Sequence, residues 1–321
     1  MSRNRFDIIT IGGAVKDFFI FLNRSLTFEN KKNFFQQKLL SFKYGDKIYL
    51  DEFYSNVGGG ACNRAVGFSR LGLKSAIKIC VNKKKYGDYI ISQLKNEKVD
   101  TSLIDNNEKK ETGMSFVLVD KYKNRDRVIL SYRGVNKFLK IDKKAKWNTD
   151  FIFLSSIGYD KWQSEFKNIE QIVKTKKIKL AFGPGNLQIS AGLNRLKNIL
   201  KLSEVLVLNK KEAVELVGLD NKTNVKELLK ILYNHGPRLI AITNGVKGVY
   251  VYDGNKVYFQ NARKVKTVET TGAGDAFSSG FVGGLIKYNY DIKKSLDLGI
   301  KNGASVVQKI GGQQGLLRLK L

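Results

Sequence analysis

The sequence predicts an α/β fold in which a doubly wound, mainly parallel sheet is flanked by helices. Short apolar runs recur along the 321 residues, and amphipathic stretches of helical length separate them. Runs that are apolar on both faces are typical of buried parallel strands, and the amphipathic stretches are typical of crossover helices. With 42% hydrophobic residues the chain can bury a core, so a disordered protein is excluded.

The apolar runs place the strands of the main sheet, and the amphipathic stretches place some of its helices. We expect strands at residues 7–11, 76–81, 151–154, 179–182, 205–208 and 239–243. We expect crossover helices at residues 61–71, 163–174 and 224–234. All of these elements are expected to belong to a single domain that spans residues 1–321.

Two further segments alternate between apolar and polar residues, which is typical of exposed or half-exposed strands. One is residues 47–54, and the other is residues 113–132, with a polar turn at 121–126. Because both lie between core elements, we expect a small β-sheet lid over a cleft, drawn from about residues 40–56 and 112–134. An ordinary edge hairpin is the alternative.

The net charge of +28 is the one anomaly of the composition. Only 12 of the 57 basic residues are arginine, whereas base and phosphate recognition favours the planar fork of arginine. The lysines are spread over the whole length, so we interpret the charge as solvated faces and expect no specific nucleic-acid partner. A polyanion-binding surface and electrostatic steering of anionic nucleotides remain alternatives.

The sequence holds no apolar stretch of membrane-spanning length, and it opens with polar residues. We therefore expect a cytoplasmic protein without a membrane partner. Its two cysteines, Cys62 and Cys80, do not cluster with the single histidine, His235. A disulfide framework and a structural zinc site are thus not expected.

The most informative motif is Glu-Thr-Thr-Gly-Ala-Gly-Asp-Ala-Phe at residues 269–277. Its glycines permit a tight turn, and the small and apolar residues that follow predict a helix, so residues 272–275 are expected at a helix N-terminus. Free N–H groups and the positive end of the helix dipole form an anion-binding site there. Asp275 lies in the first turn, where a carboxylate alone would only indicate a helix cap.

This motif strongly resembles the C-terminal signature of the PfkB or ribokinase-like carbohydrate kinases. The resemblance implies that Asp275 is the catalytic base, and that the backbone of Gly272, Ala273 and Gly274 holds the transferring phosphate. It also implies the family's architecture, a mainly parallel sheet flanked by helices with a small β-sheet lid.

The chain departs from the family signature at Glu269, where members usually have Asp. In many members that Asp binds a monovalent cation such as K⁺ beside the anion-binding turn. Glu269 and Thr271 are therefore candidate ligands of such an ion. Because Glu is longer by one methylene, we expect activation by monovalent cations to be reduced.

A second match is the run of three glycines, residues 58–60, followed by Asn63. Consecutive glycines let the backbone approach a polyol closely, and the Asn63 amide offers both a donor and an acceptor to hydroxyls. The family's N-terminal signature is similar, which implies that Gly58, Gly59 and Asn63 contact the substrate. Ribokinases proper usually have Lys where this chain has Gly60, which weakens an assignment to ribose.

The opening Gly-Gly-Ala-Val-Lys-Asp, residues 12–17, is similar to the family's opening between a strand and a helix. In the family an Asp there reaches the sugar hydroxyls, which assigns this role to Asp17. One carboxylate can accept two hydroxyl hydrogen bonds, so this residue type suits the task.

Asn209 and Glu212 follow the apolar run 205–208 and resemble the family's Asn-x-x-Glu element. The resemblance implies that Asn209 binds ATP and that Glu212 organises Mg²⁺, largely through water. Mg²⁺ keeps much of its hydration, so a site with few direct protein ligands is chemically reasonable.

Thr243, Gly245 and Gly248 follow another apolar run and resemble the family's Thr-x-Gly-x-x-Gly nucleotide loop. The glycines allow a turn that lies against the nucleotide. Asn302, in the helix after the catalytic one, stands where the family often contacts the adenine side. These four residues are the remaining candidates for ATP binding.

Together the matches predict an ATP-dependent kinase that transfers the γ-phosphoryl group to a hydroxyl of a sugar or sugar-like molecule. The expected acceptor is a neutral polyol, but Arg127 and Arg133 leave a phosphorylated sugar open. A nucleoside kinase is a further alternative, with Phe116 and Tyr132 as a shelf for a base. A non-catalytic sugar-sensing or nucleic-acid-binding relative, and a homodimer through the lid, also remain open.

Overall fold

The structure of the protein, a computed structural model, describes residues 5–22, 26–29, 38–50, 52–120, 127–159 and 161–319. Its largest feature is an eight-stranded sheet that is parallel except at one edge, where β15 and β16 run antiparallel. From edge to edge its strands are β16 (Val257–Gln260), β15 (Val249–Tyr252), β14 (Leu239–Thr243), β13 (Ser203–Asn209), β12 (Lys179–Phe182), β11 (Thr149–Leu154), β1 (Phe6–Ile11) and β6 (Ser75–Lys78). This confirms the expected doubly wound, mainly parallel sheet.

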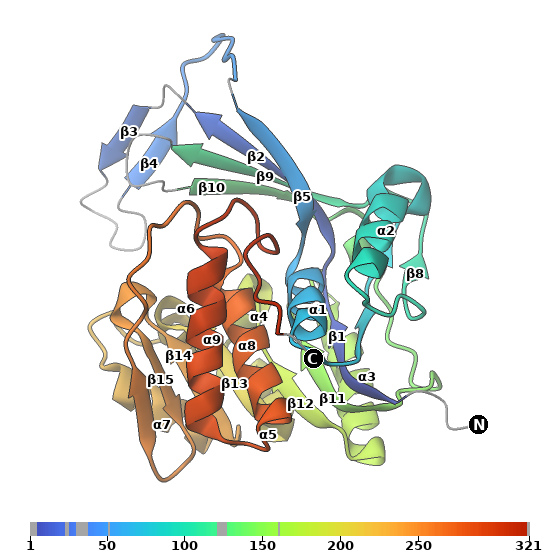
Figure 1. Ribbon diagram of the computed structural model, residues 1–321, viewed down its shortest axis with the longest axis vertical. Coiled ribbons are helices and arrows are strands. Elements are labelled where there is room, and N and C mark those ends of the chain that lie inside the picture. Colours follow the sequence, from blue (N-terminus) through green and yellow to red (C-terminus); the bar gives the residue numbers. More distant parts are fainter. Residues whose placement is uncertain are drawn as a thin grey trace.

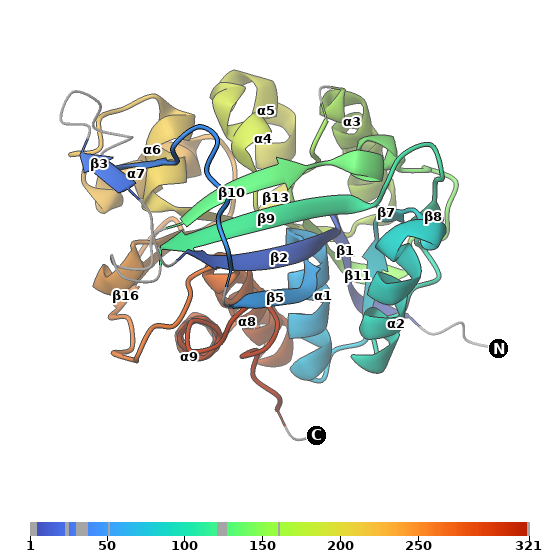
Figure 2. The same ribbon diagram turned by 90° about the horizontal axis from the view of Figure 1, so that it is seen from above.

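Helices cover both faces of this sheet (Figures 1 and 2). One face carries α3 (Trp162–Lys176), α4 (Asn186–Ser190), α5 (Gly192–Leu202), α6 (Lys210–Val217) and α7 (Val225–Asn234). The other carries α1 (Gly60–Arg70), α8 (Ala273–Lys287) and α9 (Ile292–Val306), with α2 (Asp88–Asn96) beside α1. Because the central strands are covered on both sides, their middle residues are mostly apolar, as in β12, where Leu180, Ala181 and Phe182 are fully buried.

A second sheet of four strands, here called the small sheet, lies across one end of the layered body (Figure 1). Its order is β10 (Arg127–Tyr132), β9 (Gly113–Asp120), β2 (Val15–Leu22) and β5 (Phe53–Gly58). β1 leads directly into β2, so the small sheet stands at the carboxyl ends of the parallel strands. Open α/β sheets bind ligands at this edge.

The two faces of the small sheet have different environments. Along β2, Asp17, Phe19 and Phe21 are buried, whereas Phe18 between them is only half-buried and stacks on Phe116 with ring centroids 5.2 Å apart. Since side chains alternate across a strand, Asp17 points toward the main body.

The described part of the small sheet differs from the expected lid in two respects. The strand expected at residues 47–54 is found at 53–58, and residues 42–50 contain no strand. β2 was not expected as a strand, because the motif at residues 12–17 was interpreted as lying between a strand and a helix, although residues 18–22 form an apolar run. β9 and β10 match the prediction, and the turn expected at 121–126 lies outside the described residues.

Smaller elements complete the description. Two short sheets pair β3 (Leu26–Glu29) with β4 (Lys38–Ser41), and β7 (Cys80–Val81) with β8 (Asp105–Asn106). Short helical turns occur at Lys83–Gly87, Gly134–Phe138 and Gly245–Lys247. No helix in the described ranges has the length and apolar character needed to cross a membrane.

Candidate active site

Asp275 lies in the first turn of α8, as the sequence predicted, and its carboxylate is held by two side chains of α1. Arg64 Nη2 is 2.9 Å from Asp275 Oδ1, and Asn63 Nδ2 donates to Oδ2 at 2.8 Å. The helix is capped by Gly272 at φ 81°, and a Cβ there would stand 2.5 Å from Gly312 Cα. Only glycine combines this left-handed conformation with so close an approach, so the glycine fixes where the helix begins.

Arg64 is a site residue that the sequence reasoning missed. Its side chain is nearly buried, with Nε donating to Ser278 Oγ at 2.7 Å and Nη1 donating to Ser155 Oγ at 3.0 Å. The guanidinium also lies over the Phe153 ring, 4.5 Å from its centroid. A guanidinium with this many fixed partners holds the Asp275 carboxylate in one orientation.

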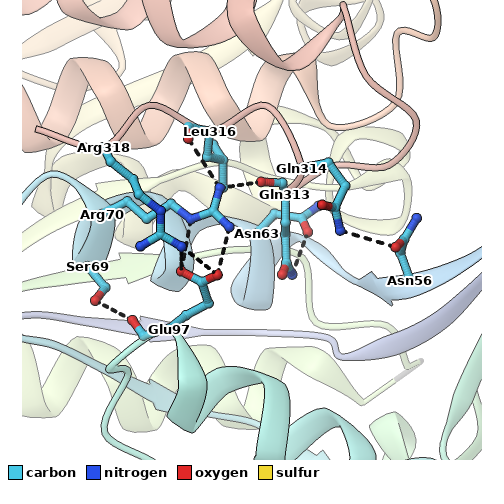
Figure 3. Close-up of polar contacts among 9 residues, drawn as sticks. All are labelled: Asn56, Asn63, Ser69, Arg70, Glu97, Gln313, Gln314, Leu316 and Arg318. Atoms are coloured by element: carbon cyan, nitrogen blue, oxygen red, sulfur yellow. Dashed lines mark hydrogen bonds and ion pairs between the residues drawn. The ribbon is translucent and has the colours of Figure 1, made fainter.

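A chain of polar contacts from the C-terminal segment fixes Asn63 (Figure 3). Gln313 Nε2 donates to Asn63 Oδ1 at 3.1 Å, which orients the amide so that Nδ2 faces Asp275. The Gln313 carbonyl in turn accepts from Arg70, which makes a two-pronged pair with Glu97. The hydrogen bonds from Arg70 lower the pKa of Glu97, so this support stays ionised at neutral pH.

The turn before α8 provides the predicted anion-binding amides only in part. Ala273 N donates to Thr270 O at 3.3 Å, so this amide is used locally. Gly274 and Asp275 come next in the first turn, where a helix offers N–H groups no partner of its own. A Cβ on Gly274 would meet nothing within 4 Å, and Gly274 lines a pocket, so there is open space beside this turn.

Glu269 is buried beside this turn, at 2% exposure. Its Oε1 accepts from Thr271 N at 2.6 Å, whereas Glu269 Oε2 and Thr271 Oγ1 are buried with no hydrogen-bond partner among the described residues. Arg127 of the small sheet places Nε 3.7 Å from Glu269 Oε1 and also bonds Thr270 Oγ1. The two unpartnered oxygens fit the predicted cation ligands, but Arg127 already supplies one positive charge.

Asp17 lies in the strand β2 and not in a loop as the sequence suggested. Its carboxylate is 5% exposed and accepts from Ser115 Oγ on β9. A Cβ on Gly58 would stand 1.8 Å from Asp17 Oδ2, so a glycine is required there. Burial raises the pKa of Asp17 to about 6, and the nearby Asp275 carboxylate adds to this rise.

Gly59 and Gly60 also permit close approach. Gly59 has φ 94°, and a Cβ on it would stand 2.4 Å from Gly13 O. A Cβ on Gly60 would meet Arg64 Nη1 at 2.6 Å. A side chain at position 60 would therefore displace the end of Arg64 from its observed position.

Asn209 and Glu212 form a reciprocal cap at the start of α6. Glu212 N donates to Asn209 Oδ1 at 2.8 Å, and Asn209 N donates to Glu212 Oε2 at 2.8 Å. Burial raises the pKa of Glu212, while the positive charge of Arg64 lowers it and the negative charge of Asp275 raises it. Among the described residues, no three His, Cys, Asp or Glu side chains are grouped so as to hold a metal by themselves.

A pocket of about 470 Å³ runs from the end of β14 to the first turn of α8. Thr243 and Gly245 line it, and so do Ala273 and Gly274. Gly248 does not line it; this residue, at φ 100°, packs where a Cβ would stand 2.3 Å from Gln260 O. The pocket has the size of a small-molecule site.

The prediction that Asn302 contacts the nucleotide is not supported by its position. Asn302 is fully buried. Its Nδ2 donates to Ala276 O and Ser279 Oγ, and its Oδ1 accepts from Leu317 N. The wall of the pocket is formed instead by Gly299 and Gly303 of α9, with Arg263 and Lys264 of the loop before α8. The sequence could have indicated this wall, because Gly299 and Gly303 are four residues apart and therefore lie on one face of the helix.

The aromatic shelf considered for a nucleoside is also not assembled. Phe116 lies on the outer face of the small sheet, stacked on Phe18, and its neighbour Ser115 is the residue that faces Asp17. Tyr132 lines a different pocket together with Arg133, whose Nη1 donates to Gly158 O at 2.8 Å.

Comparison with known proteins gives consistent results. The family model "pfkB family carbohydrate kinase" matches residues 27–318. An ATP-dependent 6-phosphofructokinase of Thermoanaerobacterium thermosaccharolyticum is 26% identical over 283 residues, which cover 85% of each protein. A ribokinase of Staphylococcus aureus is 27% identical over 281 residues, which cover 85% of this chain and 89% of that protein.

The same fold occurs in Arabidopsis thaliana ribokinase, whose structure was solved with ribose and ATP. The TM-score is 0.80 at 17% sequence identity, and the match covers 98% of this chain and 96% of that one. Structural similarity at this level of sequence identity shows a shared fold, whereas the match to the family model shows family membership. The chain therefore belongs to the pfkB family of carbohydrate kinases.

Proposed function

We propose that the protein transfers the γ-phosphoryl group of ATP to a hydroxyl of a sugar or sugar-like molecule, with Asp275 as the general base. One observation carries the proposal: Asp275 is held by Asn63 and Arg64 at the helix N-terminus where the 470 Å³ pocket ends. A carboxylate beside an anion-binding helix end is what phosphoryl transfer to an alcohol requires.

The residues present fit ATP. The nucleotide would occupy the pocket between β14 and α9, which places its phosphates at the first turn of α8. The amides of Gly274 and Asp275 would receive the transferring phosphate, together with the positive end of the helix dipole. Lys264, which lines the same pocket, adds a positive charge on this route.

Mg²⁺ would neutralise part of the phosphate charge when bound. The absence of a carboxylate cluster among the described residues fits an ion that is held mainly by phosphate oxygens and water. Glu212, in the first turn of α6, would contact that hydration shell.

The acceptor would lie between Asp275 and the small sheet. Asp17 would accept hydrogen bonds from its hydroxyls, and Gly58 leaves the room that the Asp17 carboxylate needs. As the hydroxyl attacks, Asp275 takes up its proton while Asn63 and Arg64 keep the carboxylate aligned. The small sheet would cover the reacting atoms and exclude water, which would otherwise compete as acceptor.

The test compares the wild type with Asp275→Asn, which removes proton acceptance but preserves the side-chain shape. ADP formation would be measured over a panel of sugars, sugar phosphates, sugar acids and nucleosides. With the best acceptor we expect turnover to fall by ~100-fold or more, with little change in the thermal shift caused by a non-hydrolysable ATP analogue.

Asp150→Asn is the matched control, because Asp150 lies at the amino-terminal end of β11, with its side chain half exposed. It should retain wild-type turnover. Near-native turnover of Asp275→Asn would overturn the assignment of the base. If no member of the panel increased ADP formation above background hydrolysis, the proposed function itself would be wrong.

A further inference from the structure

A row of polar side chains crosses the small sheet on the face that contains Asp17. Asp17 is the register partner of Asn56 on β5 and of Ser115 on β9, and Ser115 is the partner of Ser131 on β10. Register partners on neighbouring strands point to the same face. The row Asn56, Asp17, Ser115 and Ser131 therefore extends the acceptor side of the site from one edge of the small sheet to the other.

The row ends at a second pocket of about 320 Å³, which Ser131 helps to line. Three of its lining residues are cations, Lys110, Arg133 and Lys137, and none of the described residues that line it is acidic. From Asp17 to Ser131 the row spans two strand spacings, ~10 Å. This is about the length of an extended six-carbon chain with one more group at its end.

The cations stand on a backbone that is fixed by specific contacts. Gly134 has φ 49°, and a Cβ on it would stand 2.1 Å from Glu111 O, so the chain turns sharply directly after Arg133. Asn136 in the same turn exchanges two hydrogen bonds with the backbone of Ala14, at 3.0 and 2.8 Å. The turn is thereby tied to the segment that leads into β2.

Arg133 itself is held by its bond to Gly158 O at 2.8 Å. Only one of its five N–H donors is used in this bond, so the guanidinium keeps donors for a ligand. Lys137 is exposed, which leaves its ammonium group able to turn toward the pocket. An arginine with a fixed position and nearby lysines is a suitable site for a carboxylate or a phosphate.

We propose that the acceptor is a polyhydroxylated molecule with an anionic group, a phosphate ester or a carboxylate, at the end remote from the reacting hydroxyl. The hydroxyls lie along Asp17 and Ser115, and the anion occupies the pocket formed by Lys110, Arg133 and Lys137. This inference rests on the proposed function and replaces the neutral acceptor that the sequence suggested.

The chain's high net charge does not account for this arrangement by itself. Solvated lysines are spread over the whole sequence, but a spread of charge predicts neither a hydrogen-bonded arginine nor a pocket that continues the acceptor row. The three cations of the pocket would also attract an anionic acceptor before it binds, because a cluster of like charges draws oppositely charged ligands toward a cleft.

The experiment measures kcat/KM for three acceptors of the same carbon skeleton: a neutral hexose, its 6-phosphate and the corresponding sugar acid. We expect one of the anionic acceptors to exceed the neutral one by at least ~10-fold, as one charge-assisted hydrogen bond can provide. Whether the phosphate or the carboxylate is preferred identifies the source of the anion.

Arg133→Gln should reduce kcat/KM for the anionic acceptor by ~10-fold or more and leave the neutral one within ~2-fold. Lys137→Gln is the second variant, because Lys137 is exposed and substitution of an exposed side chain seldom changes stability. Lys144→Gln, another exposed lysine, is the control and should change neither value. Thermal shift by the anionic acceptor, with an ATP analogue present, gives a readout independent of turnover.

The two proposals fail in different ways. Turnover of neutral acceptors in preference to anionic ones would refute the anion pocket but leave the kinase intact, and so would equal losses for both acceptor types in Arg133→Gln. No turnover of any acceptor would instead refute the proposed function.

Discussion

The buried carboxyl group of Asp17 should make acceptor use depend on pH. Burial raises its pKa from 3.8 to about 6, and the nearby carboxylates of Asp275 and Glu269 add to the rise, while the hydrogen bond from Ser115 lowers it. Hydroxyl groups donate to the ionised form, whose fraction falls ~10-fold between pH 7 and pH 5 for a pKa of 6. We therefore expect the acceptor KM to rise by up to ~10-fold over this range, with the ATP KM little changed.

Folding should show the opposite dependence, because the same group is more acidic in the unfolded chain. Between pH 4 and pH 6 the unfolded state loses its proton while the folded state keeps it, so the unfolding free energy falls as the pH rises. The pKa values of Asp17 in the folded and unfolded states differ by about two units. At 1.36 kcal/mol per unit, this difference changes the unfolding free energy by ~3 kcal/mol. This contribution is fully lost above pH 6.

Asp17→Asn removes the ionisable group and keeps an oxygen that can accept from Ser115. In urea unfolding between pH 4 and pH 7, the variant should gain stability relative to the wild type by up to ~3 kcal/mol as the pH rises. Asp150→Asn, at an exposed position, should stay within about 0.5 kcal/mol of the wild type throughout. A variant-to-wild-type difference that is constant with pH, or an acceptor KM that ignores pH, would refute the reasoning.

Two further predictions concern the residues around the anion-binding turn. Arg64→Met keeps a flexible chain over Phe153 but removes the partner of Asp275; we expect turnover to fall by ~100-fold and the unfolding free energy by about 1–3 kcal/mol. Arg64→Lys should recover part of both in ADP-release and urea assays, and unchanged turnover in Arg64→Met would contradict the positioning role. For Glu269, Arg127 already supplies a cation, so turnover in potassium and in a large organic cation at equal ionic strength should be similar. Glu269→Asp should increase activation by potassium. Strong activation of the native enzyme would show that the ion site is retained, and a variant no more responsive than its parent would refute the role given to the longer carboxylate.

The elements that were predicted correctly carry their signal within a few residues. The apolar run at 179–182 is sufficient to indicate a buried strand, and the glycines before Asp275 indicate where α8 begins. The strand β2 was missed although its residues 18–22 form an apolar run of the same kind. The motif at residues 12–17 directly before this run was interpreted as lying between a strand and a helix.

Contacts between distant residues could not be predicted from one sequence. Gln313 orients Asn63 across 250 positions, and Arg64 reaches Ser278 across 214. Nothing near Gln313 or Arg64 in the sequence indicates the partner, because the pairing depends on how α1, α8 and the C-terminal segment pack together. Asn302 was assigned to the wrong environment for a related reason, since position along a helix does not reveal which side of it is buried.

The site combines groups from two parts of the fold with separate tasks. The pocket proposed for the nucleotide is built by the main body, from the end of β14 and from α8 and α9, whereas Asp17, Ser115 and the cationic pocket belong to the small sheet and the turn that follows it. Arg127 is a direct bridge between them, through Glu269 and Thr270. This contact ends at the turn directly before Gly274 and Asp275, whose amides are proposed to receive the phosphate. If an acceptor shifts the small sheet when it binds, we expect Arg127 to pass that shift to the turn, which would favour transfer to the acceptor over transfer to water.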